Sequence, residues 1–332
     1  MSDFVKVAAA SDITPGSAKK VELNGTEIAI FNLDGQFQAM DEMCPHRGGP
    51  LSEGSVDGNV VTCPFHGWQF DVTTGACLTN PAARQNKYQV KVEGNDILTA
   101  LYFKILRHDP KNPNWPDRDR LILSKGHGAP ALYAALARSG YFPVNDLMTL
   151  RKLGSPLQGH PDKRRLPGIE ASTGSLGQGL SIGIGMALAG KLDKKDYRTY
   201  VILSDGETNE GQIWEAAMFA AHHQLDHLIA ILDYNKFQLD DAVKKIIDME
   251  PVVGKWKAFG WEVLEIDGHD MDAVFGALTK AKEVRGKPVM IVAHTIKGKG
   301  VSFMENNNHY HGVAPTQEEA ERALKELEGN KF

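Results

Sequence analysis

The stretch from residue 204 to residue 237 constrains the fold more than any other part of the chain. Tyr200–Leu203 is a short apolar run that predicts a buried strand, and Asp205-Gly206 ends it with a turn. Apolar periodicity predicts a helix over Gln212–His223, and Leu228–Leu232 predicts the next buried strand. A strand, a helix and a strand in this order form a right-handed unit with parallel strands. The apolar face of the predicted helix consists of Trp214, Ala217, Met218 and Ala221.

Asp205 and Asn235 follow the two predicted strands, so we expect them to emerge side by side at the carboxyl edge of the sheet. Open α/β sheets bind their ligands at this edge. A carboxylate, an amide oxygen and nearby backbone carbonyls form an all-oxygen ligand set. Such a set suits Mg²⁺ and leaves positions on the ion for phosphate oxygens. The alternative is that both residues are ordinary polar loop residues after buried strands.

The Asp-Gly pair followed about thirty residues later by Asn resembles the thiamine-diphosphate signature. The particular residues of this stretch resemble those of transketolases. The resemblance implies that Asp205, Asn235 and the backbone carbonyl of Phe237 bind Mg²⁺, and that the ion holds the diphosphate of the cofactor. It also assigns Gly206, Glu207 and Asn235 to the cofactor-binding site.

Further motifs after residue 100 resemble the N-terminal, cofactor-binding part of transketolases. Gly126-His127-Gly128 matches a motif whose histidine reaches the diphosphate, and Gly159-His160-Pro161 matches one whose histidine touches the hydroxyls of the donor sugar. Gly174–Gly179 opens a glycine-rich helix and resembles the segment that packs on the pyrimidine of the cofactor. Taken singly, such histidines are more often structural surface residues. The resemblance implies catalytic roles for His127, His160 and His311, and cofactor binding by Gly174, Ser175 and Leu176.

The first hundred residues follow a different pattern, with short β-type runs separated by turn signals such as Asn24-Gly25 and Asp57-Gly58. This spacing predicts a small antiparallel sandwich or barrel. The predicted strands include Lys20–Leu23, Glu27–Asn32, Gln36–Asp41, Asn59–Thr62 and Tyr88–Val92.

Two loops in this region each offer one cysteine and one histidine: Cys44 with His46, and Cys63 with His66. A zinc finger would instead pair cysteine with cysteine and histidine with histidine. One of each per loop is what a Rieske [2Fe–2S] centre requires, with two thiolates on one iron and two imidazoles on the other. Residues 1–99 resemble a Rieske ferredoxin that serves aromatic-ring dioxygenases, or the small subunit of a nitrite reductase. The alternatives are a zinc ribbon and a pattern that binds no metal.

Three residues near the predicted cluster depart from the respiratory Rieske pattern. That family adds a disulfide at the positions of Gly49 and Phe65, and it places a serine hydroxyl where this chain has Trp68. Fewer hydrogen bonds to the cluster favour its oxidised state, so we expect a low reduction potential. The third cysteine, Cys77, is expected to be a small buried apolar residue.

The composition, with 42% hydrophobic and 24% charged residues, is that of a soluble protein. No segment reads as a signal peptide or a membrane span, and 3 cysteines are too few for a disulfide scaffold, so we expect a cytoplasmic location. Residues 1–99 carry 7 Lys+Arg against 12 Asp+Glu, which leaves 30 of each elsewhere. An acidic first domain disfavours nucleic acid and favours docking to a basic protein. The alternative is that this charge serves only solubility.

The two regions meet at Asp96–Leu101 without the flexible polar linker that usually joins independent domains. We expect the transketolase-like region to lack that family's first helix and Gly-His-Pro-Gly-Gly loop. We also expect it to lack the pyrimidine-binding half, whose glutamate activates the cofactor. A native fusion and a misassembled reading frame are both compatible with such a junction.

The sequence therefore predicts an all-β Rieske-type antiparallel sandwich over residues 1–99 and an α/β parallel-sheet, thiamine-diphosphate-binding domain over residues 100–332. The expected function is a one-electron carrier joined to a transketolase N-terminal subunit that transfers two-carbon ketol units between phosphosugars. Its expected partners are a basic redox protein, either a reductase or an oxygenase, another copy of the chain through the transketolase-like domain, and a transketolase C-terminal subunit. The alternative is an electron-transfer ferredoxin with a catalytically incomplete passenger. A third hypothesis, in which the cluster oxidises the thiamine cofactor, is disfavoured by the sugar-type motifs of His127 and His160.

Overall fold

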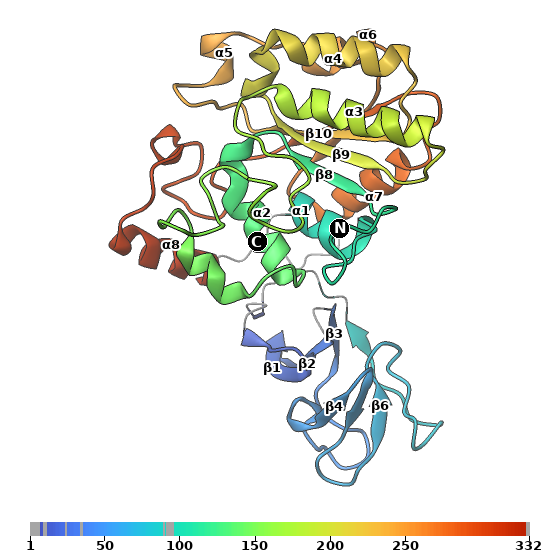
Figure 1. The fold of residues 1–332 in the computed structure, drawn as a ribbon. Helices are drawn as coiled ribbons and strands as arrows, with labels where there is room; N and C mark the ends of the chain where they lie inside the picture. Colours follow the sequence, from blue (N-terminus) through green and yellow to red (C-terminus); the bar gives the residue numbers. More distant parts are fainter. Residues whose placement is uncertain are drawn as a thin grey trace. The chain divides into compact units, whose positions relative to one another are not determined.

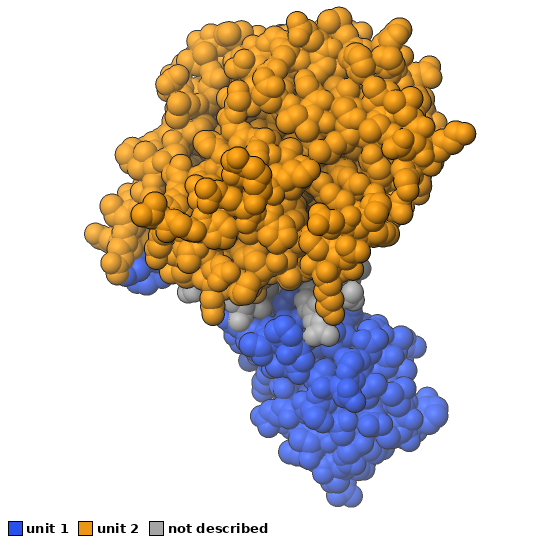
Figure 2. Space-filling view, viewed as in Figure 1, with its two compact units in different colours: residues 1–93, 321–332 blue, residues 94–320 orange. Residues whose placement is uncertain are grey.

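A computed structural model describes residues 7–8, 12–23, 25–33, 36–88, 90 and 96–329 of the 332-residue chain. The chain divides into two compact units (Figure 2). We call Met1–Glu93 with Glu321–Phe332 the β unit, and Gly94–Ala320 the α/β unit. Within the described residues, no helix is both long and apolar enough to cross a membrane.

The β unit contains two antiparallel sheets, as the sequence predicts. The larger sheet has the order β1-β2-β3-β7, and the smaller has the order β4-β5-β6. Of the predicted strand Tyr88–Val92, Tyr88 lies in β7, while residues 89, 91 and 92 lie outside the described part. The bounds are β1 Ser17–Leu23, β2 Thr26–Leu33, β3 Gln36–Asp41, β4 Ser55–Asp57, β5 Val60–Thr62, β6 Gln69–Asp71 and β7 Lys87–Tyr88.

Strand β2 is buried on both faces, which explains why its sequence is almost continuously apolar. Ala29 and Phe31 pack in one apolar cluster with Cys44 and Cys63. The alternate residues of the strand, Ile28 and Ile30, pack in the second cluster of the same unit. Because successive side chains of a strand point to opposite faces, one strand supplies both layers. The first of these clusters therefore contains the cysteines of both Cys/His loops.

The α/β unit is built on a five-stranded sheet of order β11-β12-β10-β9-β8, in which every pairing is parallel. Strands β9 and β10 lie next to each other, as the strand–helix–strand pattern predicts. Strand β9 is buried along its whole length, which is usual for a parallel sheet covered on both faces. The bounds are β8 Arg120–Leu123, β9 Thr199–Ser204, β10 Leu228–Tyr234, β11 Glu262–Asp267 and β12 Val289–His294.

Helices cover both faces of this sheet, and alternate strand residues face each layer. Figure 1 shows α3, α4 and α6 on one side and α7 on the other. Val201 and Leu203 of β9 pack with the first group, whereas Tyr200 and Ile202 pack with α1, α2 and α7. The helix bounds are α1 Asp96–Ala100, α2 Ala129–Arg138, α3 Gln178–Leu192, α4 Gly211–His222, α5 Val243–Ile246, α6 Val252–Ala258, α7 Met271–Ala281 and α8 Gln317–Gly329.

Short helical turns complete the fold, including a π-helical turn, η3, which continues directly from α1. A backbone hydrogen bond of 2.8 Å from Leu106 N to Leu101 O closes it. The stretch Asp96–Leu101, in which the sequence shows no flexible linker, is therefore helical, and the helical structure continues to Ile105. The bounds are η2 Leu51–Glu53, η3 Leu101–Ile105, η4 Gly126–Gly128, η5 Val144–Thr149, η6 Gly206–Asn209 and η7 Asn308–Tyr310.

The apolar face predicted for α4 is wrong at Met218, whose side chain is 53% exposed. The helix instead buries small residues, such as Ala216 and Ala220, together with Ile213. Small side chains allow α4 to approach α3 and the sheet closely, so the longer methionine is placed on the outer side.

Candidate iron–sulfur and cofactor sites

The two Cys/His loops of the β unit share one backbone frame. In each, the cysteine N–H donates to the carbonyl of the residue five positions later, Gly49 at 2.9 Å in the first loop and Trp68 at 2.8 Å in the second. Each loop also has a glycine in the left-handed region four residues after its cysteine, where a side chain would be strained. These are Gly48, with φ of 68°, and Gly67, with φ of 71°. Each loop therefore holds its own shape.

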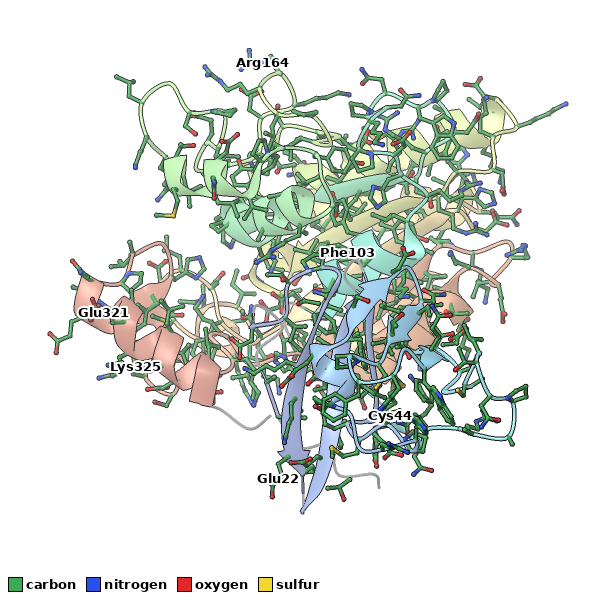
Figure 3. The ribbon with its side chains drawn as sticks, turned by 90° about the horizontal axis from the view of Figure 1, so that it is seen from below. Glu22, Cys44, Phe103, Arg164, Glu321 and Lys325 are labelled. Carbon is green, nitrogen blue, oxygen red and sulfur yellow. The ribbon has the colours of Figure 1, made fainter. Side chains whose placement is uncertain are left out.

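The predicted ligands lie in two layers. Cys44, labelled in Figure 3, and Cys63 are both buried, and burial raises the pKa of the Cys44 thiol, with the adjacent Cys63 thiol raising it further. His46 and His66 are exposed, and their ring centroids lie 4.7 Å apart in an edge-to-face arrangement. Two inner sulfurs and two outer imidazoles are the donor set of a Rieske cluster.

Gly49 and Trp68 shape the surroundings of these ligands. A Cβ atom on Gly49 would lie 2.7 Å from Cys63 Sγ and 3.0 Å from Phe65 Cγ, so only glycine leaves room at this position. The indole of Trp68 stacks on the ring of His46, with centroids 4.6 Å apart and an interplanar angle of 6°. Among the described residues, no three His, Cys, Asp or Glu side chains converge on a single ion. A binuclear cluster takes only two protein ligands on each iron.

In the α/β unit, Asp205 and the loop that carries Asn235 meet at the carboxyl edge of the sheet. Ser204 and Asp233 are paired across β9 and β10, so the two predicted magnesium ligands follow that pair by one and two residues. The carboxylate of Asp205 accepts hydrogen bonds from Gly206 N, at 2.7 Å, and from Lys236 N. The side-chain oxygen of Asn235 accepts from Phe237 N at 3.0 Å. These hydrogen bonds fix the positions of the Asp205 carboxylate and of the Asn235 side-chain oxygen.

Asp205 is fully buried, and its burial raises its pKa to about 7, although the hydrogen bonds from Gly206 and Lys236 oppose that shift. A buried carboxyl whose charge is so poorly compensated by the chain is a suitable ligand for a divalent cation. The residues present therefore fit Mg²⁺.

A second acid, the half-buried Asp233, forms an ion pair with Lys125 and accepts a hydrogen bond from Thr295 Oγ1. Although burial opposes it, the Lys125 charge lowers the pKa of Asp233. Asp233 also lies 3.4 Å from the side-chain nitrogen of Asn235, which directs the amide oxygen of Asn235 the other way. Sequence reasoning missed these residues. The signal that could have found Lys125 is its position directly before the Gly-His-Gly motif.

Two of the three predicted histidines are in contact. The rings of His127 and His311 stack with centroids 5.0 Å apart, and Lys297 Nζ lies 3.1 Å from His311 Nδ1. Although His127 is exposed, partial desolvation of its ring lowers its pKa to about 4, with the neighbouring charge of Lys125 adding to the effect. His127 is therefore neutral at physiological pH. The third histidine, His160, packs on the glycine-rich loop, where a Cβ atom on Gly174 would lie 3.1 Å from His160 Cγ.

The remaining predicted cofactor residues surround the same edge. Gly126 packs so tightly that a Cβ atom there would lie 2.8 Å from Gly174 N, and a Cβ atom on Gly206 would lie 2.7 Å from Gln238 Cβ. The carbonyl of Leu176 accepts from Gln212 Nε2 at 3.0 Å, and Ser175 is exposed. These close approaches explain why glycine occupies positions 126 and 206.

The fold and the two sites define the class of protein. Residues 90–331 match the family model described as "Transketolase, thiamine diphosphate binding domain", and residues 3–97 match the Rieske [2Fe-2S] domain. The chain therefore belongs to the transketolase family in its thiamine-diphosphate-binding part and carries a Rieske domain before it. The Rieske domain implies a [2Fe–2S] cluster, and the transketolase domain implies thiamine diphosphate.

Individual proteins similar to this chain include transketolase subunits and a whole transketolase. The chain is 54% identical, over 233 residues, to the 6-deoxy-6-sulfo-D-fructose transketolase subunit of Clostridium sp., covering 70% of this chain and 85% of that protein. It is 44% identical to an apulose-4-phosphate transketolase subunit of Phocaeicola vulgatus, covering 70% of this chain and 82% of that protein. The crystal structure of transketolase from Campylobacter jejuni matches with a TM-score of 0.66 and 38% identity. That match covers 70% of this chain but only 37% of the solved chain.

Proposed function

We propose that the α/β unit is one subunit of a divided transketolase, which transfers two-carbon ketol units between phosphosugars with thiamine diphosphate and Mg²⁺. The observation that carries the proposal is the fully buried carboxylate of Asp205, held beside the Asn235 loop at the sheet edge. The similarity to relatives named as transketolase subunits supports a division between chains. The second subunit would bring the pyrimidine-binding half.

In this proposal, Asp205, Asn235 and the backbone carbonyl of Phe237 bind Mg²⁺, and Gly206 leaves room for the diphosphate. The Gly174–Gly179 loop supplies the surface for the pyrimidine. Thiamine diphosphate, when bound, supplies the nucleophilic carbon that accepts the ketol unit. The protein residues bind, orient and exclude water around it.

The three histidines are proposed to bind the hydroxyl groups of the donor sugar. Because its pKa is lowered to about 4, His127 is a neutral imidazole that can donate one hydrogen bond and accept another. Hydroxyl groups need such partners. His311 stacks on His127 and lies next to Lys297, so both imidazoles are held in place. Together with His160, they form the proposed wall for the donor sugar.

The Rieske domain is proposed to carry single electrons through a [2Fe–2S] cluster on Cys44, His46, Cys63 and His66. The excess of 12 acidic over 7 basic residues in residues 1–99 favours a basic redox partner, either a reductase or an oxygenase. The proposed boundary between the two functions lies between residues 99 and 100. The chain is proposed to dimerise through the α/β unit.

An electron carrier with an inactive α/β unit is the second candidate. It is favoured because both Cys/His loops are complete within one unit, whereas the thiamine site needs a second subunit.

The test of the transferase separates binding from turnover. Thiamine diphosphate is titrated into the chain with and without Mg²⁺ and followed by near-ultraviolet circular dichroism, using Asp205→Ala and the exposed control Asp193→Ala. We expect Mg²⁺-dependent binding that Asp205→Ala abolishes and Asp193→Ala retains. Binding that ignores both Mg²⁺ and Asp205 would sink the proposal.

Turnover is measured separately. The chain alone should show no transketolase activity, because in this proposal the acid–base partner of the aminopyrimidine comes from the second subunit, and such a group is worth about 10²–10⁴-fold. Adding a separate C-terminal transketolase subunit should restore part of the activity. Full turnover by the isolated chain would contradict the divided site.

A further inference from the structure

Glu207 is a buried acid whose carboxylate accepts hydrogen bonds from three other points of the chain. It follows the Asp205-Gly206 turn in η6, and its side chain is fully buried. Its Oε1 accepts from Ser124 Oγ and from Gly177 N, the latter at 2.7 Å. Its Oε2 accepts from Ser204 N at 3.2 Å. One carboxylate therefore joins the end of β8, the glycine-rich loop and the end of β9.

The partners of Glu207 explain why this position is an acid. The two backbone N–H groups, from Gly177 and Ser204, approach different oxygens of the same carboxyl group. Only a carboxylate offers acceptors on both atoms, because a glutamine would turn its N–H₂ group toward one of these donors. A buried donor that faces another donor loses its hydrogen bond and stays desolvated, which destabilises the fold.

The loop that Glu207 holds has a second anchor on α4. Gln212 Nε2 donates to Leu176 O at 3.0 Å, and Gln178 Nε2 donates to Gln212 Oε1 at 2.9 Å. Gly177, between these two residues, has a φ of 81°, and a Cβ atom there would lie 2.6 Å from Gln212 Nε2. The backbone at Gly177 is thus held in a left-handed conformation by the carboxylate of Glu207 and the side-chain amide of Gln212.

Close packing makes the junction rigid. A Cβ atom on Gly179 would lie 2.4 Å from Ser124 Oγ, so the start of α3 rests directly on the residue that donates to Glu207. Gly179 and Ser124 are both buried. A change in the position of the carboxylate would therefore shift the glycine-rich loop relative to the Asp205 turn.

We propose that Glu207 is a positioning residue, which sets the Gly174–Gly179 loop against the Asp205-Gly206 turn and so pre-organises the thiamine-diphosphate site without touching the cofactor. The proposal rests on the function proposed above. It revises the sequence-based assignment of Glu207 to direct cofactor contact, since its carboxylate is fully buried and accepts hydrogen bonds from three donors of the chain.

The test compares Glu207→Gln with the exposed control Glu283→Gln in the full chain. Thiamine diphosphate is titrated at saturating Mg²⁺ by near-ultraviolet circular dichroism, and tryptophan fluorescence reports folding. We expect Glu207→Gln to weaken cofactor binding about tenfold, from the loss of one buried hydrogen bond that orders the loop, and Glu283→Gln to change nothing. A folded Glu207→Gln chain with unchanged affinity overturns the proposal.

Glu207→Asp provides the second variant, should the glutamine variant fail to fold. Aspartate keeps the charge but is one methylene shorter, so it withdraws the acceptor from the loop. Weaker cofactor binding by the folded variant supports a positioning role, and wild-type affinity overturns it. The two proposals fail differently. If the wild-type chain does not bind thiamine diphosphate, the proposed function fails, whereas wild-type binding with unaffected variants removes only the role of Glu207.

Discussion

The buried carboxyl of Asp205 should make the metal-free protein less stable as pH rises, and Asp205→Asn should remove that dependence. Burial raises the pKa of Asp205 from its ordinary value of 3.8 to about 7. Between these two values the folded chain binds a proton that the unfolded chain has lost. The free energy of unfolding therefore falls as pH rises through this window, and the fall ends above the folded pKa.

The magnitude follows from the two pKa values. Integrating the linkage relation from pH 5 to pH 8 gives a loss of about 2.6 kcal/mol, at about 1.36 kcal/mol for each pKa unit. Asparagine does not titrate, so the variant lacks this component. Every other titrating group is common to both proteins and cancels in the difference between them. The wild-type stability minus the variant stability should thus decline by about 2.6 kcal/mol between pH 5 and pH 8.

Urea unfolding in the presence of a chelator measures this difference. The ring centroid of Trp256 lies 5.2 Å from that of Trp214 and 5.1 Å from that of Trp261, and the fluorescence of this cluster reports on the α/β unit. Saturating Mg²⁺ should reverse the trend in the wild type only, because the ion binds the ionised carboxylate. A difference that is flat from pH 5 to pH 8, or that Mg²⁺ leaves unchanged, would refute the reasoning.

Three further predictions concern the β unit. The purified protein should hold two irons and two sulfides per chain with an anisotropic electron-spin signal on reduction, whereas stoichiometric zinc would contradict the Rieske assignment. Its reduction potential should be near the low end of the Rieske range, roughly −150 mV, because Gly49, Phe65 and Trp68 replace the disulfide and the hydroxyl; protein-film voltammetry above about +150 mV would disprove this. Gly49→Ala should lower the iron content severalfold, since its Cβ atom would lie 2.7 Å from Cys63 Sγ, while the open position Gly185→Ala should leave it unchanged.

The fold could be predicted from sequence because both kinds of sheet leave a local pattern in the chain. Tyr200–Leu203 and Leu228–Leu232 are short apolar runs, and they became the paired strands β9 and β10. The prediction for Met218 was wrong because periodicity identifies the apolar face of a helix but does not show which side of that face packs against the sheet. In α4 the buried edge belongs to alanines, whose small size the periodicity does not weigh.

The two sites differ in how far sequence reasoning reaches, and the reason is the span of their contacts. Each Cys/His loop closes within five residues through its own backbone hydrogen bonds, so its ligands can be read from one short motif. The proposed thiamine site instead depends on pairs such as Lys125 with Asp233 and Ser124 with Glu207, which are 108 and 83 residues apart. Such pairs exist only after the sheet has formed. Variants at Cys44 or Cys63 should therefore act on the proposed cluster alone, whereas variants at Asp233 or Glu207 should alter the strand ends that are proposed to hold the cofactor.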